Sequence, residues 1–108
     1  MTIYFKVAKG TVAAGATKEK VGEFTVPSDE RWTITDILPL VPADCKLYIH
    51  IQREEIGEID GDIIAKDNRW IPVDWELSAG QKIEFKADNP TGSDVEVGVQ
   101  LRINIEKT

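Results

Sequence analysis

Apolar and polar residues alternate strictly along DVEVGVQLRINIE, residues 94–106. A period of two is the spacing of side chains on one face of a β-strand, so one face of this segment is buried and the other meets water. An antiparallel sheet with one solvated face produces this pattern. The side chains predicted to face the core are Val95, Val97, Val99, Leu101, Ile103 and Ile105.

The preceding segment, QKIEFKAD, repeats the alternation with Ile83, Phe85 and Ala87 on the inward face. The link between the two segments, NPTGSD, contains a proline and a glycine, which are residue types that set turn geometry. Residues 81–105 are therefore predicted to form a β-hairpin.

Upstream segments have the composition and alternation of shorter strands. IYFKV alternates through Ile3, Phe5 and Val7 and is expected to be the first strand. Residues 9–20 are small and polar and are expected to form a loop or a mobile arm. LPLVPAD contains two prolines and is excluded as a central strand. Further strands are expected in GEFTV, RWTITDI, KLYIHIQ and IPVDWEL.

The acidic segment REEIGEIDGDII admits two interpretations. Ile56, Ile59 and Ile63 fall at helical spacing, but Gly57 and Gly61 would each cost a helix about 1 kcal/mol relative to alanine. An Asp–Gly dipeptide is also a hairpin-turn signal. We therefore predict strand-turn-strand here, a solvated charged hairpin with its turn at the Asp–Gly dipeptide.

These elements together predict the fold class. Strands recur roughly every 8–15 residues with turn signals between them, and no long segment has a helical pattern. A chain of 108 residues has the length of one domain. We expect an all-β fold, a single antiparallel β-sandwich of about eight strands over residues 1–108 that is jelly-roll-like.

Charge and composition exclude several partners. The net charge of −6 repels phosphate backbones, so we expect no nucleic-acid partner. No apolar run approaches the ~20 residues of a membrane helix, and none at the N-terminus resembles a signal peptide. We expect a soluble protein made in the cytoplasm. The single cysteine, Cys45, excludes an intrachain disulfide and is expected to be a small buried apolar residue.

The sequence contains no recognisable catalytic constellation. It has no G-x-S-x-G segment, and its only histidine, His50, lies five residues from Cys45. An odd separation places two side chains on opposite faces of one strand, which separates this nucleophile from its base. We therefore expect neither enzymatic activity nor a cofactor.

Three acids could be read as calcium ligands. Glu58, Asp60 and Asp62 alternate, as do the first ligands of an EF-hand loop, but the sixth position holds Ile63 where glycine is required. Calcium binding by irregular sandwich loops stays open as a third alternative, behind the interpretation of these acids as part of a turn.

Exposed aromatics suggest carbohydrate binding as the first alternative function. Trp70 follows Arg69 at the start of a strand, and Tyr48 lies on the polar face of its strand. Rings in such positions can stack on sugars or on a partner protein. Trp32 and Trp75 share parity with core residues and are expected to be buried.

The outward row Tyr48, His50 and Gln52 is less charged than the other polar faces. Interfaces are enriched in aromatic residues and depleted of lysine and glutamate. The row is a candidate contact of a homo-oligomer, for which a closed ring such as a trimer would also protect edge strands.

The last third of the chain resembles small jelly-roll virion proteins of tailed phages and archaeal viruses. The resemblance rests on an L-x-x-G-x-x-I turn, formed by Leu77, Gly80 and Ile83, and on the long final hairpin that ends at Ile105. It implies a structural role as a capsid-associated or decoration protein, assembled in the host cytoplasm and packed against other coat subunits. No site residue is carried over from the resemblance.

Overall fold

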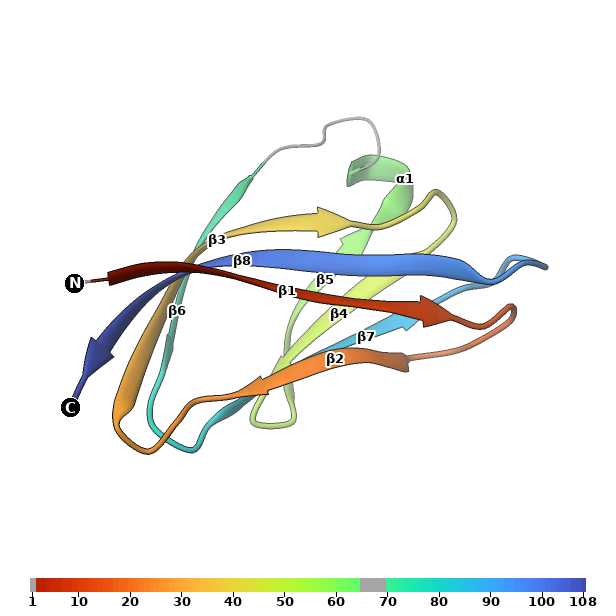
Figure 1. Ribbon diagram of the computed structural model, residues 1–108. Helices are drawn as coiled ribbons and strands as arrows, with labels where there is room; N and C mark the ends of the chain where they lie inside the picture. Colours follow the sequence, from red (N-terminus) through yellow and green to blue (C-terminus); the bar gives the residue numbers. More distant parts are fainter. Residues whose placement is uncertain (1, 65–69) are drawn as a thin grey trace.

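Two four-stranded antiparallel sheets face each other in the computed structural model, which describes residues 2–64 and 70–108 (Figure 1). One sheet has the strand order β1-β8-β3-β6 and the other β2-β7-β4-β5. The elements are β1 (Thr2–Val12), β2 (Glu19–Thr25), β3 (Glu30–Leu40), β4 (Lys46–Ile51), β5 (Glu54–Asp60), the helical turn α1 (Gly61–Ile64), β6 (Ile71–Leu77), β7 (Lys82–Asp88) and β8 (Val95–Lys107).

The pairing scheme is that of a jelly roll. The first strand pairs with the last, β2 with β7, β3 with β6, and β4 with β5. The chain is therefore one long antiparallel ribbon, folded back at the β4–β5 turn and rolled into two sheets. The predicted antiparallel β-sandwich of eight strands is confirmed. Within the described ranges no helix is long and apolar enough to cross a membrane.

The core lies between the sheets. The inward side chains of β8 are buried as predicted, and Leu101 and Ile103 are completely covered. They face the inward residues of β7, including Phe85, which packs edge-on against Phe24 with ring centroids 6.5 Å apart. Trp32 is 2% exposed, which confirms its predicted place in the core.

The predicted hairpin over residues 81–105 is wrong in its pairing. Both strands exist, but β7 pairs with β2 and β4, whereas β8 pairs with β1 and β3 in the other sheet. The intervening loop crosses from one sheet to the other. Alternation reports which face of a strand is buried, and it does not identify the neighbouring strand, so two facing strands look like a hairpin.

The loop or arm expected at residues 9–20 is much shorter. The pairing of β1 with β8 continues without a register shift to Val12, and β2 begins at Glu19. Small residues allow the two strands to approach closely. A Cβ atom on Gly10, within this range, would lie 3.0 Å from the carbonyl oxygen of Val21 on β2, so the small size of residue 10 serves strand packing rather than mobility.

The acidic segment forms one strand and a helical turn rather than a hairpin. The hairpin turn lies earlier, at Gln52 and Arg53, which both have positive φ angles, 52° and 72°. Two-residue hairpin loops need this conformation even where the residues are not glycine. At the expected turn, the Asp60 side chain accepts a hydrogen bond from the Asp62 amide instead and so caps the start of α1.

Gly61 is required where the chain leaves β5. A Cβ atom there would lie 1.9 Å from the carbonyl oxygen of Pro42, closer than any side chain tolerates. The glycine therefore marks a close approach of two backbones and not a hairpin turn.

Pro39 lies inside β3, but in a part of the strand that is not central, in agreement with the expectation for LPLVPAD. It pairs with Val99 of β8, but the pairing of β3 with β6 extends only to Ile37. Pro39 thus has a neighbouring strand on one side only. Proline, which lacks an amide proton, is tolerated at such an edge position.

A single buried polar side chain ties one end of the sandwich together. Asn89 is fully buried, and its amide donates hydrogen bonds to the carbonyl oxygens of Val12, Ala13 and Ser93 at 3.1, 3.2 and 2.8 Å. Its own carbonyl oxygen accepts from Thr91. The β1–β2 loop and the β7–β8 loop are therefore held by one residue.

We expect Asn89→Ala to lower the free energy of unfolding by about 2–4 kcal/mol, because it leaves several buried carbonyl groups without donors. Urea unfolding measures the change. The matched control is Asn104→Ala, on the half-buried outer face of β8, for which a loss below about 0.5 kcal/mol is expected. Equal losses for the two variants would contradict the role assigned to Asn89.

Candidate interaction surface

Tyr48 and His50 of the outward row lie on β4 and Gln52 lies in the turn that follows it, but Tyr48 is not free to bind a partner. Its ring is 8% exposed and lies beneath the ammonium group of Lys18, which is 4.8 Å from the ring centroid. Its hydroxyl group donates a 2.6 Å hydrogen bond to Asp88. This bond and burial raise the pKa of Tyr48 far above its ordinary value of 10. The expectation that Tyr48 is an exposed aromatic is wrong, because side-chain parity gives direction and not coverage.

Of the two other members of the row, His50 is largely covered and Gln52 is bonded within the molecule. The His50 side chain is 13% exposed, and its Nε2 atom lies 3.7 Å from a Glu55 carboxylate oxygen. Gln52 accepts a 2.8 Å hydrogen bond from the Lys82 amide and so joins the β4–β5 turn to β7. Tyr48 and Gln52 therefore serve to join β4 and its turn to β7 within the β2-β7-β4-β5 sheet.

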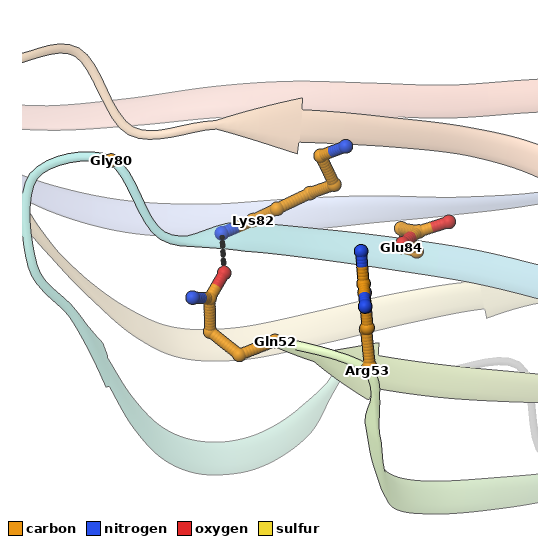
Figure 2. A pocket seen from close by; sticks show the side chains of 5 residues that line it. All are labelled: Gln52, Arg53, Gly80, Lys82 and Glu84. Atoms are coloured by element: carbon orange, nitrogen blue, oxygen red, sulfur yellow. Dashed lines mark hydrogen bonds between the residues drawn. The ribbon is translucent and has the colours of Figure 1, made fainter.

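A polar depression of about 410 Å³ lies beside this turn (Figure 2). The Arg53 side chain reaches across it from the turn toward β7, where Lys82 and Glu84 lie. Lys82 also pairs with Glu23 at 3.3 Å. The mixture of both charges makes the depression a solvated part of a charged sheet face.

The three acids considered as calcium ligands instead accept hydrogen bonds from backbone amides or form an ion pair with a lysine. Glu58 pairs with Lys46 at 3.2 Å, and Asp62 accepts a 2.9 Å hydrogen bond from the Asp44 amide. Asp60 caps α1, as described above. Among the described residues, no three side chains of the metal-binding types are grouped so that they could hold an ion.

Cys45 is completely buried, as expected for a small apolar residue. Burial raises the pKa of its thiol, and the sulfur lies 3.7 Å from the Asn89 carbonyl oxygen. The neutral thiol is a poor nucleophile, and His50 lies on the outer face of the sheet.

Trp70 faces outward, just before β6, and is 36% exposed. Its ring lies 5.9 Å from that of Phe5 on β1, with the two planes tilted by 59°. Arg69, the other candidate at this place, lies outside the described residues. Trp70 is thus the one candidate of the sequence interpretation that the structure places on an accessible apolar surface.

This surface is the outer face of the β1-β8-β3-β6 sheet, and the sequence interpretation missed it. Ile3, Phe5 and Val7 of β1 are 49%, 57% and 57% exposed, and Leu40 of β3 is 52% exposed. A shallow depression of about 220 Å³ between Val7 and Leu40 is lined mainly by apolar atoms. We call Ile3, Phe5, Val7, Leu38, Leu40 and Trp70 the apolar face.

The outer face of the second sheet has the opposite character. Ion pairs cross it, such as Lys20 with Glu23 at 2.8 Å and Lys46 with Glu58 at 3.2 Å. Exposed pairs of this kind contribute little to stability, but they keep a surface hydrated. The sandwich is therefore asymmetric. The outer face of the second sheet is charged, whereas that of the first sheet carries the apolar residues beside ion pairs such as Arg31 with Glu76 and Arg102 with Asp36.

The sequence matches no protein-family model and no curated protein. Its structure is similar to that of the nucleoplasmin-like N-terminal domain of Drosophila FKBP39, with a TM-score of 0.43 and 14% identity. The likeness covers 90% of this chain and 87% of that domain. A likeness at this level supports no functional argument, so the function has to be argued from the surface itself.

We expect the ionisation of Tyr48 to be delayed in the folded protein. Because its folded pKa is raised, the neutral hydroxyl stabilises the fold below about pH 10, and this contribution is lost as the pH rises further. Absorbance titration should show that one of the two tyrosines ionises late.

The variant Tyr48→Phe should remove the late step, and Tyr4→Phe should retain it. A late step that survives in Tyr48→Phe would contradict the assignment.

Proposed function

We propose that this chain is a non-enzymatic interaction domain that assembles with copies of itself through the exposed apolar side chains of β1. The observation that carries the proposal is the exposure of Ile3, Phe5 and Val7 along one strand. Apolar surface of this kind, rimmed by polar residues, is typical of protein contacts. Here the rim includes the ion pair between Lys9 and Glu96, at 2.7 Å.

The proposed contact differs from the one expected from sequence. In the row of Tyr48, His50 and Gln52, Lys18 covers the Tyr48 ring, so assembly through this ring would have to displace Lys18 and break the hydrogen bond between Tyr48 and Asp88. The apolar side chains of β1 make no comparable polar bond. Their burial against a partner would gain free energy without that cost.

The specific assembly that we propose is a virion coat, to which the chain would belong as a capsid-associated or decoration protein. Support comes from the L-x-x-G-x-x-I turn of that resemblance and from the jelly-roll pairing of the eight strands, although the final hairpin of the resemblance does not form. The chain should then co-purify in fixed stoichiometry with particles from cells that encode it, and its absence from such particles would exclude this role.

Carbohydrate binding has less support as a function. Tyr48 is covered, and the accessible rings of Phe5 and Trp70 are tilted by 59° and do not form one flat platform. A glycan-array signal that Trp70→Ala abolishes would reverse this ranking.

Replacing Phe5 and Val7 together by aspartate should abolish self-association. Burial of one such side chain stabilises a contact by about 1.5–3 kcal/mol, so losing two should weaken association at least about a hundredfold. Light scattering coupled to size exclusion should give the single-chain mass of 12.1 kDa for this variant and a multiple of it for the unaltered protein.

The matched control adds the same charge elsewhere. Thr17→Asp with Gly92→Asp alters two exposed loop residues away from β1 and should retain the multimer. A monomeric unaltered protein at its highest soluble concentration, or equal losses in variant and control, would exclude β1 as the contact.

A further inference from the structure

β1 is the longest of the four edge strands, and a strand pairs with it along one edge only. Its eleven residues pair with β8 without a register shift, and no other strand of the described chain pairs with it. The three other edge strands, β2, β5 and β6, have seven residues each. A long unpaired edge is a template for a further strand, because its backbone amide and carbonyl groups can bond to another chain.

The other edge strands carry features that oppose such pairing. β6 contains a proline and two acids, and β5 contains four acids. The pairing of β2 has a bulge between Lys20 and Gly22. Prolines, charges and bulges are the usual means by which proteins protect sheet edges. β1 contains neither a proline nor an acidic residue, and its only charged side chains are Lys6 and Lys9. Its edge is thus the least protected of the four.

β2 of the facing sheet packs against the second half of β1 and leaves the first half open. A Cβ atom on Gly22 of β2 would lie 3.1 Å from Cβ of Ala8, so the two strands are in close contact there. Toward the N-terminus of β1 the two strands diverge (Figure 1). Residues 3–7 are therefore the accessible part of the edge.

Charge on this side of the sandwich is close to balanced. β1 and β2 together contain three lysines and two acids. Most of them are bonded within the chain: Glu19 to the Ala13 amide, Glu23 to Lys20 and Lys82, and Lys9 to Glu96. Lys6 points inward, and its ammonium group lies 5.4 Å from the centroid of the Trp32 ring. Net charge therefore neither drives nor prevents the approach of a second copy, and the backbone edge and the apolar side chains decide.

We propose that the β1 strands of two copies pair antiparallel along their free edges and join two four-stranded sheets into one. The inference rests on the proposed self-association and specifies its geometry. Such a contact uses the same surface of both copies and has a two-fold axis, so it closes at the dimer. The axis is perpendicular to the joined sheet, so the apolar faces of the two copies lie on the same side and become continuous.

The sequence of β1 favours one register, in which Phe5 of one copy lies opposite Phe5 of the other. Ile3 then lies opposite Val7, so every outward pair is apolar. On the inward face Tyr4 lies opposite Lys6. Aromatic and β-branched side chains in such cross-strand pairs stabilise an antiparallel sheet.

The neighbouring registers are less favourable. Centring the pair on Lys6 would place two ammonium groups opposite each other. Centring it on Tyr4 would leave Val7 without a partner in β1, and centring it on Val7 would place Phe5 opposite Lys9. Lys6 therefore acts on the choice of register and does not prevent pairing.

Thiol cross-linking tests the register. Phe5→Cys should form a disulfide-linked dimer of twice 12.1 kDa on mild oxidation, because opposite Cβ atoms lie about 4.5–5.5 Å apart, close to the span of a disulfide. Ile3→Cys mixed with Val7→Cys should give the mixed dimer, identified by intact mass spectrometry. Each of these two alone should link at least about tenfold less, since its thiols would lie about 13 Å apart along the strands.

Two controls accompany these variants, and far-UV circular dichroism checks the fold of each. The unaltered chain, whose one thiol at Cys45 is buried, should give no linked dimer. Leu40→Cys lies at an exposed position of the apolar face on β3 and should also give none. Efficient linking at position 40 would show that two apolar faces pack against each other and would overturn the edge pairing.

The outcomes separate the two proposals. If the unaltered chain is monomeric at its highest soluble concentration, the proposed self-association itself fails. If it is multimeric, but Phe5→Cys does not link and the mixture links no better than its components, self-association stands and the edge pairing is overturned.

Opposite charges introduced at Tyr4 give a second readout. In the proposed register position 4 lies opposite Lys6 twice in each dimer, so Tyr4→Glu should associate about tenfold more tightly than Tyr4→Lys. The net charge of −6 would by itself favour the reverse order, because glutamate adds to the repulsion between acidic chains. Equal affinities, or tighter association of Tyr4→Lys, would overturn the register.

Discussion

The structure depends on the folding of the chain back upon itself at the turn of Gln52 and Arg53. Each strand of the first half pairs with its counterpart in the second half, from β4–β5 next to the turn to β1–β8 at the ends of the chain. Rolling of the folded ribbon adds the pairing of β3 with β8, which makes β8 a central strand and leaves β1 at the edge of its sheet. As a consequence, the apolar side chains Ile3, Phe5 and Val7 of β1 lie exposed at the edge of a sheet and not in the core.

The turn itself has an unusual sequence, since two residues other than glycine adopt positive φ angles. Each such residue costs roughly 1–2 kcal/mol, and the bond from the Lys82 amide to Gln52 offsets part of this cost. At the other end of the sandwich, Asn89 performs the corresponding role for the two loops that cross between the sheets. The ribbon is thus held by hydrogen bonds at the β4–β5 turn and at the two loops that Asn89 joins.

Much of the fold follows from the sequence pattern, because burial of alternate residues in strands is a local property. The alternation in β8 correctly predicted which side chains face the core, and Trp32 was placed correctly by parity. Pairing is not local, so β7 and β8 were wrongly joined. The N-cap at Asp60 and the backbone contact at Gly61 required knowledge of the neighbouring loop around Pro42.

The candidate surface was harder to predict for a physical reason. In β1 both faces contain apolar residues, Tyr4 and Ala8 on one and Phe5 and Val7 on the other, so alternation does not identify the buried face. For Tyr48 the direction was correct, but a long lysine side chain covers the ring. Trp70 was identified because it follows a polar segment at a strand start, and its neighbour Phe5 comes from the opposite edge strand.

The most direct measurement is amide hydrogen exchange of the unaltered chain at low and high protein concentration. The central claim is that assembly covers β1. We expect amides of residues 3–7 to exchange more slowly as concentration rises, while those of the charged face, such as Lys86, do not change. Protection confined to β4 and β7, or no dependence on concentration in β1, would contradict the claim.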